Sequence, residues 1–314
     1  MNITVAGVGG VGGYFGGKLA RFNNEAGSPH HISFLARGTH RTEIEQHGLI
    51  LRTADEGELR CVPDLVTDDA ADVPDPDLCL VCVKAYDLPG IIKQLAPRLS
   101  PDTVLLPLLN GVDIYSRIRR VTSVGRVLPA CVYVGTHIEK PGVVVQSGGA
   151  CTILFGPQPG GPDDRFDPTP ITSLFEHAGI KYEWDNDPYP AIWSKFIFIA
   201  AFGLVGAARD KTLDEITTSV ELSESVRRIM EEIDRLARAS GVSLSPTIVQ
   251  ESYAKASGFP PGTKTSFQRD IERPGKPDER DLFGGTVLRL GAEYGLSVPE
   301  TERVYQALRD RNPQ

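Results

Sequence analysis

The sequence lacks any concentrated run of lysine and arginine, and its acidic residues outnumber its basic ones. It has 33 Lys and Arg against 41 Asp and Glu, which gives a formal net charge of −8. Surfaces that bind nucleic acid or anionic lipid need clustered positive charge. We therefore expect neither nucleic acid nor a membrane surface as the partner of this chain.

Segments that direct a protein into or across a membrane are also lacking. The first residues, MNITVAGVGG, carry no positive charge ahead of an apolar core, so no secretory signal is expected. The apolar run from Phe196 to Ala208 is shorter than the roughly 20 residues that a bilayer requires. The chain is expected to be cytoplasmic.

Cysteine is scarce, and its number is odd. The five residues, Cys61, Cys79, Cys82, Cys131 and Cys151, are scattered along the chain. This pattern fits a reduced, cytoplasmic protein better than a disulfide framework. Cys79 and Cys82 form a C-x-x-C in an apolar segment of strand type, where residues three apart point to opposite faces. No metal site is expected.

The first part of the chain alternates apolar segments of strand length with helical patterns. The strand-like segments are ITVAGV, HISFLA, LCLVCVKA and TVLLPLLN. Apolar strands separated by helices indicate a parallel sheet that is covered on both faces. Further β-rich stretches follow at 127–148 and 151–156, and the Pro-, Gly- and Asp-rich segment 156–170 is expected to be a surface loop.

From about residue 191 onward the patterns are helical. At 314 residues the chain is longer than one hydrophobic core usually supports, so two domains are expected. The predicted fold class is α/β. A Rossmann-type, doubly wound parallel sheet is expected in residues 1–187, and an all-helical domain in residues 188–314.

A glycine motif, Gly7-x-Gly9-x-x-Gly12, follows the first apolar segment and opens a helical pattern. In this context the first glycine permits a tight turn, the second lets a pyrophosphate approach the backbone, and the third allows the helix to pack on the strand. The N-terminus of the helix then offers unpaired N–H groups to the anion. A purely structural glycine turn is the alternative.

The second strand-like segment ends in ARGTHR, with Arg37 near the position where NAD-binding sites place an acid. No carboxylate stands beside it in the sequence. A guanidinium there suits the 2′-phosphate of NADP. The alternative is a solvated surface arginine.

Four further motifs complete a set. They are VCVKAYD around Lys84, LLNGVD around Asn110, WSKF around Lys195, and SFQRDIERPGKPDERDLFGG with Ser266 and Glu279. With the glycine motif, in this order and spacing, the chain resembles the ketopantoate reductase (2-dehydropantoate 2-reductase) family along essentially its whole length. The resemblance implies NADPH-dependent reduction of 2-dehydropantoate to pantoate, a step of pantothenate biosynthesis.

The resemblance also implies a role for each motif. Lys195 matches the catalytic lysine that protonates the carbonyl oxygen, and Glu279 matches an acid that supports the active site. Ser266 matches a serine that helps hold the substrate carboxylate. Lys84 and Asn110 match residues near both the nicotinamide and the substrate. The residues assigned to cofactor binding are Gly7, Val8, Gly9, Gly10, Val11, Gly12, Arg37, Lys84 and Asn110.

The chemistry asks for a lysine such as Lys195 on independent grounds. Hydride transfer to a ketone builds negative charge on oxygen, which a donor in a dry site must neutralise. Apolar walls lower the pKa of an ammonium and ease release of its proton. The alternative is a lysine at a helix edge that reaches water.

Other readings remain open for the remaining positions. Ser266 could be the N-cap of a helix, Glu279 could lie in a solvated charged loop, and Asn110 before Gly111 could be a turn residue.

The chain departs from the family pattern at two positions after the lysine. Ile199 and Gly203 stand where the family has asparagines, on the same helix face as Lys195. Asp278 and Arg280 also replace a threonine and an aliphatic residue. An apolar wall discriminates between substrates weakly, so a different branched or aromatic 2-oxo acid is a second hypothesis. A non-catalytic NADP-binding regulator is a third, and the C-terminal helices are candidates for a homodimer interface.

Overall fold

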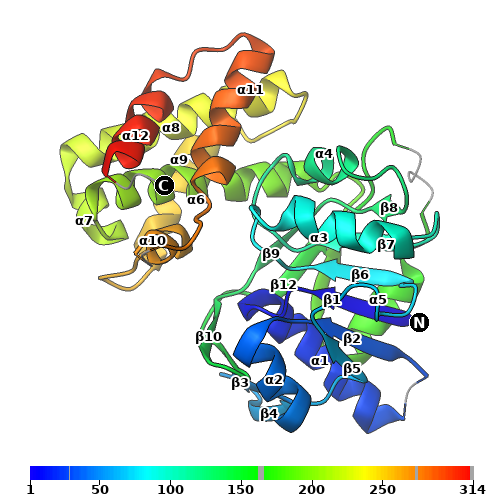
Figure 1. The fold of residues 1–314 in the computed structure, drawn as a ribbon. Coiled ribbons are helices and arrows are strands. Elements are labelled where there is room, and N and C mark those ends of the chain that lie inside the picture. The colour runs from blue at the N-terminus through cyan, green and yellow to red at the C-terminus, as the bar shows by residue number, and fades with distance from the viewer. Residues whose placement is uncertain (28, 162–165, 273–274, 312–314) are drawn as a thin grey trace. The chain divides into compact units, whose positions relative to one another are not determined.

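The computed structural model describes residues 1–27, 29–161, 166–272 and 275–311 (Figure 1). The chain forms two compact units. Unit 1 comprises Met1–Asn110 and Ile114–Pro188, and unit 2 comprises Gly111–Asp113 and Tyr189–Gln314. The main division thus follows Pro188, and the predicted division follows residue 187.

Unit 1 is built on a six-stranded sheet with the order β5-β2-β1-β6-β7-β8, in which every neighbouring pair is parallel. Its central strands are almost completely buried, as expected for strands covered on both faces. The predicted parallel sheet is therefore confirmed. The strands are β1 Asn2–Ala6, β2 His31–Leu35, β5 Leu65–Thr67, β6 Leu78–Val81, β7 Val104–Pro107 and β8 Arg126–Val127.

Helices flank this sheet. α1 packs beneath β1 and β2 with its Phe15 and Leu19 side chains fully buried, and α3 and α4 lie together beside β6 and β7 (Figure 1). The helices of unit 1 are α1 Gly10–Ala26, α2 Gly38–His47, α3 Leu88–Leu95 with a 3-10 turn Ala96–Arg98, α4 Ile114–Arg119 and α5 Thr169–His177.

Two smaller sheets complete unit 1. One has the order β10-β11-β3-β4 and the other β13-β12-β9. The strands are β3 Leu49–Thr53, β4 Gly57–Cys61, β9 Ala130–Tyr133, β10 Thr136–Lys140, β11 Val143–Gln146, β12 Thr152–Phe155 and β13 Lys181–Trp184. The β-rich stretches predicted at 127–148 and 151–156 are confirmed. Within the predicted loop 156–170, residues 162–165 lie outside the described residues.

Unit 2 is helical, as predicted. α6 packs against five other helices of the unit, namely α7, α8, α9, α10 and α12. The elements are α6 Tyr189–Arg209, α7 Leu213–Thr218, α8 Val220–Ala239, α9 Ile248–Ala254, a 3-10 turn Lys255–Gly258, α10 Ser266–Ile271, a π-helical turn Asp281–Gly285, α11 Thr286–Tyr294 and α12 Pro299–Arg311.

The expectation that the apolar segment of α6 is too short to cross a membrane is wrong. The helix has 21 residues and is apolar enough for a span, but 72% of its most apolar 18-residue window is buried inside the protein. A core helix that contacts other helices all around has the same composition. The burial of α6 therefore accounts for its hydropathy without a membrane.

All five cysteines are free thiols. Burial raises the pKa of Cys79 to about 12, so this thiol stays protonated. Across the described ranges, no three His, Cys, Asp or Glu side chains are grouped so that they could hold a metal ion.

Candidate functional site

The glycine motif forms the turn between β1 and α1. Gly7 has φ +96°, a conformation that favours glycine, and its N–H donates to the carbonyl of Leu35 on β2 at 3.1 Å. A Cβ at Gly12 would lie 2.1 Å from the carbonyl oxygen of Gly7, so only glycine lets the helix approach the turn this closely. A Cβ at Gly9 would meet no atom within 4 Å.

The N-terminus of α1 opens at this turn. Gly9 is the N-cap and carries no side chain that could cap the first N–H groups of the helix. Such N–H groups, together with the helix dipole, favour an anion. Val8 is buried in the core and Val11 is half-buried, while a Cβ at Gly10 would lie 2.8 Å from Thr136 Oγ1. The close approach of Thr136 therefore explains why position 10 is a glycine.

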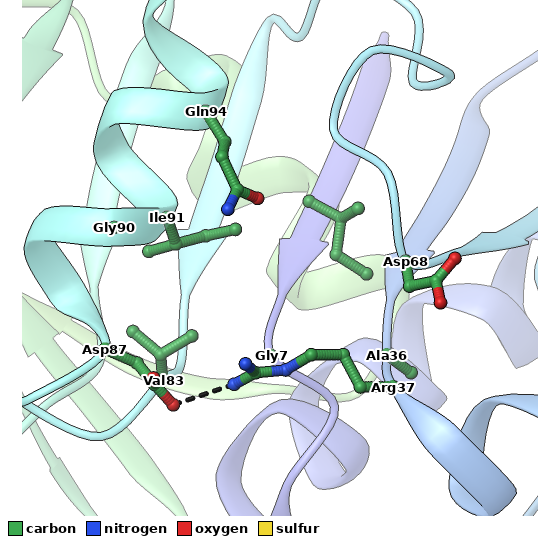
Figure 2. Close-up of a pocket in the computed structure, with 10 residues that line it drawn as sticks. Gly7, Ala36, Arg37, Asp68, Val83, Asp87, Gly90, Ile91 and Gln94 are labelled. Carbon is green, nitrogen blue, oxygen red and sulfur yellow. Dashed lines mark hydrogen bonds and ion pairs between the residues drawn. The ribbon is translucent and has the colours of Figure 1, made fainter.

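A cavity of about 150 Å³ lies at the carboxyl ends of the strands, beside Gly7. Parallel sheets bind ligands at this edge. Its wall includes Arg37 after β2, Asp68 after β5 and Asp87 after β6, and the apolar side chain of Ile91 on α3 (Figure 2). The cavity thus combines apolar surface with three charged groups.

The charged groups are paired. Arg37 Nη2 donates to Asp87 Oδ2 at 2.7 Å, the contact drawn as a dashed line in Figure 2. Arg41 Nη1 on α2 donates to Asp68 Oδ1 at 3.0 Å. Sequence reasoning placed Arg37 at the nucleotide site but found no carboxylate beside it. The structure brings Asp87 to Arg37 from a loop 50 residues further along the chain.

Lys84 and Asn110 follow two neighbouring strands. β6 and β7 pair in parallel, so the residues beyond their carboxyl ends emerge at the same edge of the sheet. Both residues are half-buried. Neither lines the cavity beside Gly7. Their predicted roles near the nicotinamide and the substrate stay predictions.

Lys195 lies in the first half of α6. The residue itself is half-buried, and its neighbours Trp193 and Phe196 are 3% and 1% exposed. Phe196 stacks on Phe283 of the π-helical turn with ring centroids 6.1 Å apart. Phe283 lies four residues after Glu279, and its N–H donates to the carbonyl of Glu279. The stacked rings therefore join the segment that carries Lys195 to the segment that follows Glu279.

Glu279 is 4% exposed, so the alternative of a solvated charged loop is wrong. Its neighbours Asp278 and Arg280 are also buried and form an ion pair with each other. Arg280 donates from Nε to Oδ1 of Asp278 at 2.9 Å and from Nη2 to Oδ2 at 2.7 Å. This pairing compensates the buried charges of Asp278 and Arg280. Residues 273 and 274 of the same motif lie outside the described residues.

Ser266 is the exposed first residue of α10 and not its N-cap. The cap is Thr265, whose Oγ1 accepts from the N–H of Gln268 at 3.2 Å, while Gln268 Oε1 accepts from the N–H of Thr265 at 2.9 Å. This reciprocal capping box satisfies the helix end without Ser266. The Ser266 hydroxyl is therefore not used for capping.

The face of α6 after Lys195 is apolar. Ile199 is half-buried, and a Cβ at Gly203 would lie 3.4 Å from Phe267 Cδ1 of α10. Phe198 stacks on Phe259 with centroids 5.7 Å apart and an angle of 10° between the rings, and Phe259 is 46% exposed. Ile199 and Gly203 thus stand where the family pattern has amides, beside the stacked rings of Phe198 and Phe259.

Lys255 is a residue that sequence reasoning missed. Its Nζ donates to Ser194 Oγ at 3.2 Å, on the residue before Lys195. Burial lowers the pKa of Lys255. Its place in the sequence, in a short polar stretch with no recognisable motif, gives no sign of this contact.

Two family descriptions match the chain. Residues 3–160 match "Ketopantoate reductase PanE/ApbA", and residues 188–312 match "Ketopantoate reductase PanE/ApbA C terminal". A 2-dehydropantoate 2-reductase from Mesorhizobium japonicum is 26% identical over 332 aligned residues, which cover 98% of this chain and 97% of that protein. YkpB of Bacillus subtilis, an uncharacterized oxidoreductase, is also 26% identical, with 98% of both chains covered.

Solved structures share the fold. The PanE/ApbA family ketopantoate reductase from Ralstonia eutropha has a TM-score of 0.87 and 27% identity, with 100% of both chains covered. A D-mandelate dehydrogenase in complex with NADH and anilino(oxo)acetate has a TM-score of 0.83. It is 20% identical, with 99% of this chain and 98% of that chain covered, so the likeness is one of fold.

Proposed function

Because this chain belongs to the PanE/ApbA family of ketopantoate reductases, whose members are oxidoreductases, we propose that it reduces 2-dehydropantoate to pantoate with NADPH. The observation that carries the proposal is Lys195 on a largely apolar helix, packed through Phe196 against the segment that follows buried Glu279. Pantoate made in this way would feed pantothenate synthesis.

Unit 1 has the features that a dinucleotide needs. The turn at Gly7 and the open space at Gly9 leave the N-terminus of α1 accessible to a pyrophosphate, and the cavity at Arg37 lies beside it. Arg37 supplies a guanidinium for the 2′-phosphate of NADP. When bound, the dinucleotide supplies the hydride that is added to the carbonyl carbon of the substrate.

Lys195 is the proposed general acid. As the carbonyl carbon gains the hydride, the carbonyl oxygen gains an electron pair and takes a proton from the ammonium. The half-buried position keeps part of the water away from the ammonium. Glu279 is the proposed supporting acid, and the exposed hydroxyl of Ser266 is the proposed donor to the substrate carboxylate.

A second substrate class has a specific observation in its favour. Ile199, Gly203 and the Phe198–Phe259 stack make this part of unit 2 apolar and aromatic. Such a wall suits a branched or aromatic 2-oxo acid, and it discriminates between substrates only weakly. The D-mandelate dehydrogenase of the same fold was solved with an aromatic oxo acid.

An NADPH-oxidation assay over a panel of aliphatic, branched and aromatic 2-oxo acids tests the substrate. The highest kcat/KM is expected for 2-dehydropantoate. Equal or faster turnover of an aromatic 2-oxo acid would replace it by the second class. Turnover of no 2-oxo acid, with NADPH still bound, would favour a non-catalytic NADP-binding regulator.

The Lys195→Ala variant tests the acid. General acid catalysis contributes about 10²- to 10⁴-fold, so kcat should fall by that factor. The dissociation constant for NADPH should stay unchanged. Lys181→Ala, at an exposed lysine on β13, is the matched control and should keep full activity. Unchanged turnover in Lys195→Ala would mean that another group donates the proton.

A further inference from the structure

We propose that Asp87 weakens the preference of this protein for NADPH over NADH, because its carboxylate competes with the cofactor's 2′-phosphate for Arg37. The inference rests on one part of the proposed function, namely that the cavity beside Gly7 holds the adenosine end of the dinucleotide. It makes Asp87 a specificity-determining residue, and neither the glycine motif nor the end of β2 predicts it.

The geometry brings Asp87 to the guanidinium. Asp87 is the residue before α3, in the loop that follows β6, and its Oδ2 lies 2.7 Å from Arg37 Nη2. Both residues line the same cavity, and Figure 2 shows the Arg37 side chain extending toward Asp87. A phosphate that binds this guanidinium must take the place of the carboxylate or share the guanidinium with it.

The second charged pair leaves no cationic excess at this end of the cavity. Asp68 also lines the cavity, and Arg41 Nη1 lies 3.0 Å from its Oδ1. The two arginines are thus matched by two carboxylates. A 2′-phosphate would bring roughly −1.5 to −2 charges to this balanced group.

NADH would meet the same group differently. Its ribose carries a hydroxyl at the 2′-position, which can donate a hydrogen bond to a carboxylate. Asp87 and Asp68 can accept such a bond without giving up charge balance. Asp87 therefore favours binding of NADH, whereas Arg37 favours binding of NADPH.

Exposure sets the size of the effect. The side chains of Arg37 and Asp87 are 73% and 36% exposed, so water screens their attraction and the phosphate can displace the carboxylate. The remaining cost to NADPH binding is the repulsion between Asp87 and the nearby 2′-phosphate, which water screens in part. Removing that charge should tighten NADPH binding by about tenfold.

The test measures dinucleotide binding directly, without any substrate. Dissociation constants for NADPH and NADH are determined by calorimetric titration of the wild type, Asp87→Asn, Arg37→Gln and the double variant. Asp102→Asn is the matched control. It removes one exposed carboxylate that also pairs with an arginine, Arg126 at 3.1 Å, but it precedes the amino end of β7.

We expect Asp87→Asn to lower the dissociation constant for NADPH about tenfold. The dissociation constant for NADH should stay the same or rise. In the Arg37→Gln background the same change should give a clearly smaller gain for NADPH, because the competition for the guanidinium is gone. Asp102→Asn should change neither constant.

Several results would overturn the proposal. An unchanged NADPH-to-NADH ratio in Asp87→Asn, or an equal gain with and without Arg37, would show that Asp87 does not act on the 2′-phosphate. If the dinucleotides bind but no 2-oxo acid is reduced, the proposed function fails and this inference stands. Absence of any dinucleotide binding by the wild type would sink both.

Discussion

Replacing Gly9 by alanine tests whether the turn before α1 is a binding surface or only a structural turn. In the folded protein the new methyl group meets no atom within 4 Å, and the φ of −81° suits alanine. Alanine restricts the unfolded chain and stabilises by about 0.4–1 kcal/mol. It is a poorer N-cap than glycine by a similar amount. The two effects offset, so the free energy of unfolding should change by less than about 0.5 kcal/mol.

Binding should respond differently. A pyrophosphate at the N-terminus of α1 has to approach the backbone at Gly9, and the methyl group would occupy that space. Loss of one hydrogen bond between an N–H group and the charged phosphate costs about 1.5–3 kcal/mol. The dissociation constant for NADPH should therefore rise about 10- to 150-fold.

Two glycines provide the comparisons. Gly258→Ala places a methyl group in equally open space within unit 2, at a position that is not an N-cap, so it should stabilise the protein by about 0.4–1 kcal/mol and leave NADPH binding unchanged. Gly12→Ala puts a Cβ 2.1 Å from the carbonyl oxygen of Gly7 and should destabilise unit 1 itself. Urea unfolding and calorimetric titration measure the two quantities. Wild-type affinity for NADPH in Gly9→Ala would refute the placement of the pyrophosphate at this turn.

Two further predictions concern unit 2. Buried Glu232 accepts hydrogen bonds from the N–H groups of Glu300 and Thr301 at 2.7 and 2.9 Å. Glu232→Gln turns an NH₂ group toward one of these donors, so the free energy of unfolding in urea should fall by about 1–3 kcal/mol. The control Glu231→Gln, at an exposed position, should not change it measurably. Hydrogen bonds from Lys211 and from the N–H of Thr212 lower the pKa of Glu215 to about 2, so its contribution to stability is present above about pH 4.5 and is lost as the pH falls toward 2. Glu215→Gln should flatten the stability profile in that window, and an unaltered slope would contradict the assignment.

The fold could be predicted where burial leaves a simple pattern. Strands such as Leu78–Val81 and Val104–Pro107 are covered on both faces, so they read as uninterrupted apolar runs. α2 left no such pattern, because only Ile44 of its ten residues is buried. The β3–β4 hairpin was missed as well. Its polar residues alternate over a short stretch, and its partner strand β11 lies some 90 residues away in the sequence.

The site could be predicted where function is encoded locally. Spacing within six residues identified the turn at Gly7, whereas the contact between Arg37 and Asp87 depends on the strand order β2-β1-β6. The burial of Glu279 could not be predicted from its neighbours, which left a solvated loop open as an alternative. Its neighbours are charged, which suggests a solvated loop, but Asp278 and Arg280 neutralise each other and allow the whole stretch to be buried.

Packing also bears on the missing amide at the second turn of the helix after Lys195. A Cβ at Gly203 would already touch Phe267, which is 1% exposed and packs on Phe283 with ring centroids 5.0 Å apart. An asparagine would add three further heavy atoms beyond this contact, next to a buried aromatic cluster. The same cluster, through Phe283, holds the segment of Lys195 in place. The apolar wall and the position of the proposed acid therefore have one cause, so a substitution that restores an amide at Gly203 should disturb the acid rather than simply add a hydrogen bond to substrate.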